Sequence, residues 1–146
     1  MMNFLKHCKV TRVENAAAAG QTELKSDVLD QGDGDAFDSV AFIALLGDVD
    51  NTSVLTLTVK SNPTSSDVGG TSEGATAAYT ATATDADNKM LIVDVYRPTQ
   101  RFVFASLTRT VANAVVDGII AVQYNARDLP VAQPASVLAS AFSQRG

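Results

Sequence analysis

Apolar and polar residues alternate along most of this chain, which is the pattern of half-buried β-strands. The clearest case is VLTLTVKS (54–61), where Leu55, Leu57 and Val59 alternate with polar side chains. The segment SVAFIALLG (39–47) is apolar at nearly every position and rich in β-branched and aromatic residues, which favours a strand covered on both faces over a buried helix. The pattern therefore predicts β structure.

The other segments of this kind are separated by clusters of turn-forming residues. About eight strands with such spacing predict an all-β, single-domain β-sandwich or jelly roll. The expected strands cover 4–13, 22–29, 39–47, 54–61, 76–84, 90–97, 102–110 and 118–127.

Two segments between these strands are expected to be loops. The run ENAAAAG (14–20) has too few alanines to nucleate a helix. The run NPTSSDVGGTSEGAT (62–76) is rich in Ser, Thr and Gly, and loops of that length are usually functional or disordered. We expect 76–84 to follow it as a weak edge strand.

The chain has 146 residues, which fits one domain, expected at 1–134. Pro130 and Pro134 separate the last strand from a C-terminal arm at 135–146. This arm would carry one apolar stripe if helical, and a helix of that length is marginal in water. We therefore expect it to be mobile in the free protein and to become ordered on a partner, anchored by Leu138 and Phe142.

The N-terminal segment, with Met1, Met2 and Phe4, is a second candidate arm. It has no apolar core after a basic start, so no signal peptide is expected. No segment approaches the length of a membrane span. The net charge is −5 with scattered Lys and Arg, which argues against direct nucleic-acid binding. We expect a protein made in the cytoplasm, and its low charged fraction of 18% indicates a surface covered by another protein.

The acidic turn Asp30, Asp33, Asp35 and Asp38 is the best metal candidate, because carboxylates in a Gly-containing loop suit calcium. Its spacing does not match the twelve-residue calcium loop, and Asp and Gly are ordinary turn formers. We therefore expect no metal and no cofactor. Replacing Asp33 and Asp35 by Asn is expected to leave folding and partner binding nearly intact.

Catalytic signatures are missing from the sequence. His7 is the sole histidine, and in a strand it would point away from Cys8, so the pair would not form a dyad. Motifs for a nucleophile elbow, a phosphate-binding loop or a dinucleotide fold are not found. A single cysteine also excludes an internal disulfide. We expect no enzymatic activity.

Three segments of the second half carry a resemblance to a known family. They are VYRP (95–98) with RFV (101–103), NAVVDG (113–118), and IAVQYNAR (120–127) with Pro130; FDSVAFIALLGDV (37–49) adds to them. In these segments the chain resembles the capsid cement or decoration proteins of tailed phages over roughly residues 24–131.

That resemblance implies a jelly-roll-like subunit on the outer capsid surface of the virion, made in the host bacterial cytoplasm. It implies the major capsid protein as a partner, together with self-association at symmetry axes. Two alternatives stay open. One is a head–tail connector or tail virion protein, and the other is a carbohydrate- or calcium-binding β-sandwich module.

The residues expected to self-associate lie on one face of the strand at 90–97. Its alternation places Leu91, Val93 and Val95 on one side, and Met90, Ile92 and Tyr96 on the other. An apolar second face needs a cover, and a partner sheet is the natural one. We expect a homo-oligomer, most simply a dimer because two-fold interfaces are the commonest.

Overall fold

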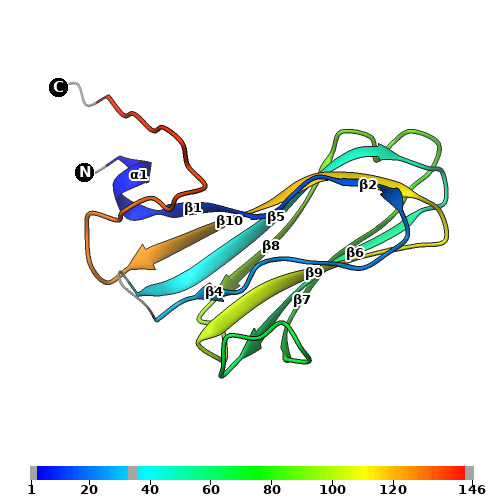
Figure 1. Ribbon diagram of the computed structural model, residues 1–146. Coiled ribbons are helices and arrows are strands. Elements are labelled where there is room, and N and C mark those ends of the chain that lie inside the picture. Colours follow the sequence, from blue (N-terminus) through cyan, green and yellow to red (C-terminus); the bar gives the residue numbers. More distant parts are fainter. Residues whose placement is uncertain (1–2, 33–35, 144–146) are drawn as a thin grey trace.

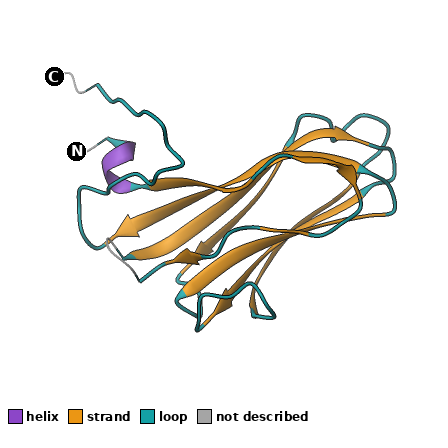
Figure 2. Ribbon diagram, in the orientation of Figure 1, coloured by secondary structure: helices purple, strands orange, loops and turns teal. Residues whose placement is uncertain are grey.

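The computed structural model describes residues 3–32 and 36–143. Figures 1 and 2 show two layers of strands, with a short helix and the two ends of the chain at the same end of the sandwich. The helix is α1 (Phe4–His7). The strands are β1 (Lys9–Glu14), β2 (Ala17–Gly20), β3 (Leu24–Lys25), β4 (Leu29–Asp30), β5 (Phe37–Val49), β6 (Val54–Asn62), β7 (Thr71–Thr80), β8 (Met90–Tyr96), β9 (Phe102–Thr110) and β10 (Ala114–Ala126).

The strands form two five-stranded sheets. The first sheet has the order β1-β10-β5-β8, and β2 also pairs with β10. The second sheet has the order β3-β9-β6-β7, and β4 also pairs with β9. This arrangement confirms the predicted all-β, jelly-roll-like sandwich.

The core lies between the two sheets. Side chains alternate along each strand, and most of those that face inward are apolar, with Arg109 and Gln123 as buried polar exceptions. Its largest fully buried members are Phe42, Leu55, Leu57, Leu107 and Ile119. The alternation read in 54–61 is confirmed, because Leu55, Leu57 and Val59 are all fully buried.

The structure has more strands than the eight predicted, because one expected loop contains a strand and one expected strand is divided into two. The expected loop at 14–20 holds β2, whose Ala17 and Gly20 pair with Val116 and Ala114 of β10. The expected strand at 22–29 is interrupted between β3 and β4. There Asp27 donates its main-chain N–H to Val13 of the first sheet, so the segment links the two layers.

Other boundaries also differ from the sequence prediction. Residues 4–7 of the expected first strand form α1 instead. The expected loop at 62–76 is shorter because β7 begins at Thr71. This strand ends at Thr80 rather than at 84, and it is an edge strand as expected. Pairing with β6 explains the early start of β7. Thr71 and Ser72 lie opposite Ser61 and Lys60, so these polar residues form part of the sheet despite their loop-like composition.

Candidate functional site

The outer face of the first sheet carries a row of isoleucines across three strands. In the register of the sheet, Ile120 of β10 lies opposite Ile43 of β5. Ile43 in turn lies opposite Ile92 of β8. Neighbouring residues of these strands point into the core, so the three isoleucines project from the sandwich. An outward apolar row of this kind is unusual for a sheet that meets only water.

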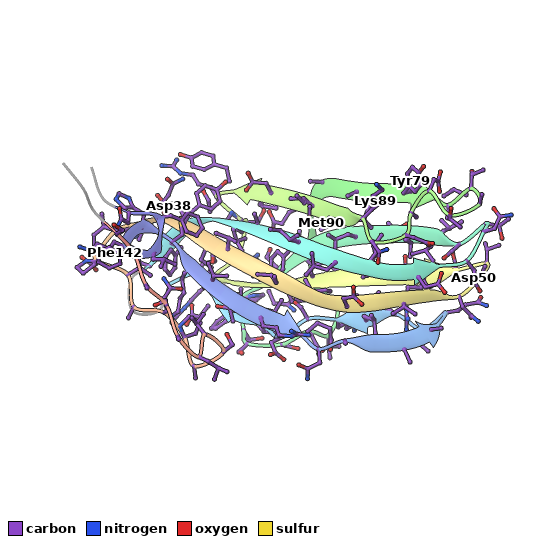
Figure 3. All side chains as sticks on the ribbon, turned by 90° about the horizontal axis from the view of Figure 1, so that it is seen from above. Asp38, Asp50, Tyr79, Lys89, Met90 and Phe142 are labelled. Carbon is purple, nitrogen blue, oxygen red and sulfur yellow. The ribbon has the colours of Figure 1, made fainter. Side chains whose placement is uncertain are left out.

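Apolar residues continue on either side of this row. Val10 lies opposite Val122, Val122 opposite Ala41, and Leu45 opposite Met90. Figure 3 looks onto this side of the molecule, where β1, β10, β5 and β8 lie side by side and Met90 is labelled. We call this surface the outer apolar face. It comprises Val10, Ala41, Ile43, Leu45, Met90, Ile92, Ile120 and Val122.

The opposite outer face of the sandwich has a different chemistry. On the second sheet, Thr108 of β9 lies opposite Thr56 of β6, and Thr58 lies opposite Thr76 of β7. Their neighbours in the same strands are core residues, so the hydroxyl groups face outward. We call this surface the threonine face. It comprises Thr56, Thr58, Thr76, Thr80, Thr108 and Thr110, together with Val54, Ala78 and Ser106 of the same strands. Such a face suits contact with water.

The sequence-predicted residues of β8 lie together at the edge of the first sheet. Met90, Ile92 and Tyr96 are 56%, 51% and 65% exposed, respectively. Val93 and Val95 on the other side of the strand are buried. The predicted division of this strand into two faces is therefore present in the structure.

A cavity of about 280 Å³ adjoins Met90 at the seam between the sheets. Tyr79, Asp85 and Lys89 are among its lining residues. The Tyr79 hydroxyl donates to Asp85 at 2.6 Å, and this bond lowers the pKa of the Asp85 carboxyl and raises that of the Tyr79 hydroxyl. The polar side chains of Tyr79, Asp85 and Lys89 thus lie beside Met90 at the apolar edge of β8.

A second tyrosine–aspartate pair crosses the outer apolar face. The Tyr124 hydroxyl of β10 donates to Asp94 of β8 at 2.5 Å. Burial raises the pKa of Tyr124, and the hydrogen bond to Asp94 raises it further. The pair spans β5 and holds the Asp94 carboxylate over the sheet rather than beyond its edge.

The predicted anchors of the C-terminal arm lie elsewhere. Leu138 is 99% exposed, and the Phe142 ring lies 4.6 Å from the Lys6 ammonium nitrogen of α1. Figure 3 places Phe142 at the α1 end of the molecule, away from Met90. The described part of the arm, residues 135–143, is not helical, so the apolar stripe considered for a helix is not formed there.

The segment before the arm runs along β1 and occupies its free edge. The Gln133 amide oxygen accepts the Val10 N–H at 3.0 Å, and its amide nitrogen donates to the carbonyls of Leu5 and Cys8. The Ser136 hydroxyl accepts the Arg12 N–H at 3.2 Å. Side chains therefore take the place that a further strand would fill beside β1.

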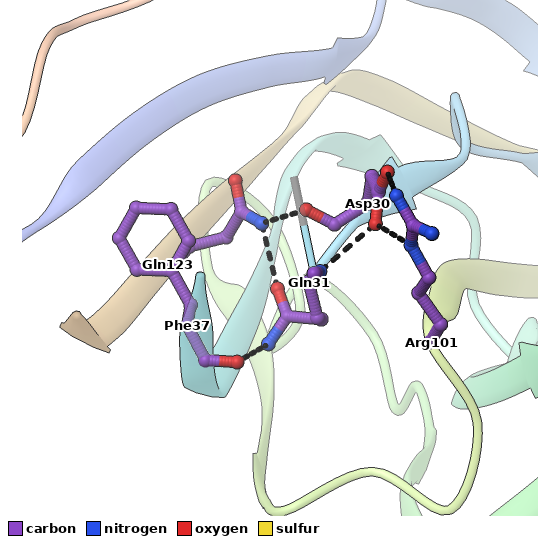
Figure 4. A network of polar contacts seen from close by, with 6 residues as sticks. Asp30, Gln31, Phe37, Arg101 and Gln123 are labelled. Atoms are coloured by element: carbon purple, nitrogen blue, oxygen red, sulfur yellow. Dashed lines mark hydrogen bonds and ion pairs between the residues drawn. The ribbon is translucent and has the colours of Figure 1, made fainter. Parts of the chain in front are cut away.

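The acidic turn contributes ion pairs in its described part. Asp30 binds Arg101 through two contacts of 2.7 Å, which join the end of β4 to the start of β9 (Figure 4). Asp38 accepts from Arg127 at 3.1 Å. Asp33 and Asp35 lie outside the described residues. Among residues 3–32 and 36–143, no group of three or more His, Cys, Asp or Glu side chains is placed to hold a metal ion.

Amides extend this network into the core. Gln123 of β10 donates from its amide nitrogen to Gln31 at 2.6 Å, and Gln31 donates to the carbonyl of Phe37 at 3.3 Å (Figure 4). Both glutamines are buried. The network therefore ties β10, β4 and β5 together at one end of the sandwich.

His7 and Cys8 do not lie in a strand, so the prediction that they point to opposite faces of one was wrong. His7 ends α1, and Cys8 caps it by donating its N–H to the Phe4 carbonyl at 2.9 Å. Burial raises the pKa of the Cys8 thiol, which disfavours the reactive thiolate.

Sequence reasoning missed the part of the outer apolar face that lies on β5 and β10. The signal was present in 39–47, whose unbroken apolar run predicted a cover on both faces. The structure covers one face of β5 fully, while Ala41, Ile43 and Leu45 on the other remain partly exposed. The partner strands that complete the face are fixed by register, which the sequence pattern does not reveal.

Comparisons with known proteins give little further information. No family model matches the chain, and no curated protein matches it. Among solved structures, the chain is similar to the Eiger TNF of S. frugiperda, with a TM-score of 0.38 and 9% sequence identity. That similarity covers 92% of this chain and 99% of the other. No helix of the described residues is both long and apolar enough to span a bilayer.

Proposed function

We propose that this chain is a structural docking subunit without catalytic function. The observation that carries the proposal is the difference between its two outer faces: one consists mostly of Ile, Val, Leu and Met side chains, and the other mostly of Thr side chains. Removing apolar surface from water contributes about 25 cal/mol per Å², from which the entropy cost of association is subtracted. A sandwich with this asymmetry gains most by laying its first sheet on another protein and keeping its second sheet in water.

The partner we propose is the capsid lattice of a tailed phage, with the major capsid protein as its building block. The resemblance of residues 24–131 to capsid cement proteins supports this partner. The subunit would sit on the outer surface of the virion after synthesis in the host bacterial cytoplasm. It would act as a homo-oligomer, without cofactor and without direct contact to nucleic acid or membrane.

Such a protein stabilises its lattice by mass action. It binds the assembled shell more tightly than free capsid subunits and shifts the equilibrium toward the shell. Many copies on one lattice multiply modest contacts through effective concentration. Neither effect requires a catalytic residue.

The proposal is tested by mixing purified protein with matching capsids and measuring the bound copies after sedimentation. The test variant is Ile43→Thr with Ile120→Thr, which keeps β-branched side chains but makes the middle of the outer apolar face polar. We expect binding to weaken about tenfold or more, because each exchange removes apolar contact worth about 1 kcal/mol.

The matched control makes the reverse exchange on the other face, Thr56→Ile with Thr108→Ile. It should bind capsids as the parent chain does, and the melting temperature of both variants should confirm that they fold. Equal loss of binding by the two variants, or full occupancy by the isoleucine-to-threonine variant, would contradict docking through the first sheet. Hundreds of bound copies per particle are expected; about six or twelve would contradict a cement and fit a connector.

A further inference from the structure

Three of the four lateral edges of the sandwich are blunted. The edge of β1 is occupied by the side chains of Gln133 and Ser136. On the second sheet, β3 and β4 have only two residues each. The register of β7 is continuous only from Thr76 to Thr80, because it shifts where Gly74 adopts a φ of +79°. Natural sheets use short, irregular or covered edges to prevent pairing with other chains.

The edge of β8 has none of these features. Its register with β5 is continuous from Met90 to Tyr96. Lys89 accepts from Leu46 of β5, and Arg97 donates to Asp38, so odd-numbered residues bond inward to β5. The even-numbered residues therefore direct their N–H and C=O groups to the free edge. They have no main-chain partner among the described residues, and they are Met90, Ile92, Asp94 and Tyr96.

We propose that β8 pairs antiparallel with β8 of a second copy, with the two-fold axis at Ile92. This inference deepens the self-association contained in the proposed function and rests on it for its biological use. The two first sheets would become one continuous sheet. In this register Ile92 lies opposite its own copy, and Met90 lies opposite Asp94 on both sides of the axis, giving about six new main-chain hydrogen bonds.

Charge selects this register. The registers that oppose most of the edge residues are centred on Ile92, Val93 or Asp94. Centring on Asp94 places two carboxylates directly opposite each other, and centring on Val93 brings Lys89 and Arg97, the residues that flank β8, close together at both ends of the pairing. Like charges directly opposite are destabilising in antiparallel pairs. The register centred on Ile92 has neither conflict.

Self-complementarity is what favours a second copy as the occupant of this edge. With the axis at Ile92, the row Ile120, Ile43 and Ile92 meets the same row of the second copy end to end. The outer apolar faces of two subunits then form one wider face on the same side of the sheet. A two-fold interface uses the same patch twice, as this row allows. Tyr96 lies beyond the paired segment.

Disulfide trapping tests the register directly. Residues in a hydrogen-bonded antiparallel pair have Cα atoms about 5.5 Å apart, which lies within the range that a disulfide spans. In a Cys8→Ser background, Ile92→Cys should form covalent dimers rapidly on mild oxidation without capsids present. Ile120→Cys, on the same face but separated from the edge by β5, is the matched control and should stay monomeric on a denaturing gel.

A charge exchange gives a second measurement. Ile92→Lys and Ile92→Glu should each sediment as monomers, because each places like charges at the axis, and their mixture should sediment as a dimer. A strictly monomeric parent chain, or faster trapping by Asp94→Cys than by Ile92→Cys, overturns the proposal. The Ile43→Thr, Ile120→Thr variant should remain dimeric while it loses capsid binding, so failure of the pairing and failure of the docking function are distinguishable.

Discussion

Arg109 is the clearest case of a single residue that holds the sandwich together. It is 2% exposed and projects inward from β9. Its guanidinium donates to the carbonyls of Ala18, Thr22 and Ala114 and to the Thr22 hydroxyl. Burial lowers its pKa, and among the described residues no carboxylate pairs with it. Main-chain carbonyls therefore solvate the buried guanidinium, and these hydrogen bonds join β9 of the second sheet to β2 and β10 of the first.

Replacing Arg109 by Met is expected to lower the free energy of unfolding by about 2–4 kcal/mol, because several buried carbonyls lose their donor. Urea denaturation followed by fluorescence or circular dichroism measures this. Arg127→Met is the matched control, since the ion pair of Arg127 with Asp38 is at the surface and such pairs contribute about 0–1 kcal/mol. Equal losses in the two variants would show that the buried contacts of Arg109 have no special weight.

At the scale of elements, the segment after β10 covers an edge strand with side chains. Val131 is buried and donates its N–H to Lys6, and Gln133 bonds three main-chain groups around α1 and β1. Contacts also continue past the boundary expected at residue 134: the Ser143 carbonyl accepts from the Asn3 amide, and the Phe142 ring lies 4.6 Å from the Lys6 ammonium nitrogen. Beyond it, Ser136 makes a hydrogen bond to β1, while Leu138 is left in solvent.

Two truncations test this division. Deleting 135–146 should leave the melting temperature nearly unchanged and lower capsid occupancy, as expected for an arm that orders on its partner. Deleting 131–146 should lower the melting temperature by about 5–10 °C, because it also removes a buried valine and the Gln133 bonds. Calorimetry measures both. If the shorter deletion unfolds the protein, the arm belongs to the core; if it binds capsids fully, the arm has no docking role.

At the scale of the whole molecule, strands from opposite ends of the chain pair with each other. β1, near the start, pairs with β10, the last strand, and β10 is also central to the first sheet through its pairing with β5. Non-local pairings must pay loop-closure entropy before they gain contacts. The first sheet therefore forms only when most of the chain has been brought together.

Refolding is accordingly expected on the timescale of milliseconds to seconds, as for other sandwiches of non-local topology. Stopped-flow dilution from urea measures the rate. The refolding rate of Phe42→Ala is compared with that of the parent chain. This variant removes a fully buried ring from β5 and should destabilise the fold by about 3–5 kcal/mol. Complete refolding within microseconds would contradict the dependence on long-range pairing.

The sequence by itself determined the fold class and the inward-facing residues of its most regular strands. Alternation in 54–61 and 90–96 marked which side chains point inward, because side chains in a strand alternate with a period of two. It also separated Met90, Ile92 and Tyr96 from Val93 and Val95. It misplaced α1, β2 and the break between β3 and β4, since these make bonds to the distant residues Gln133, Arg109 and Val13, respectively.

Only the tertiary structure decided how the strands are ordered and in which register they pair. Nothing local in the sequence indicates that Ile43 lies between Ile120 and Ile92, because strands far apart in the chain are aligned by the core as a whole. The same holds for the edges: β8 has no further strand beside it in the described part of the chain, while β1 is covered by residues more than a hundred positions away. Local pattern sets which way a side chain points, and long-range packing sets what stands beside it.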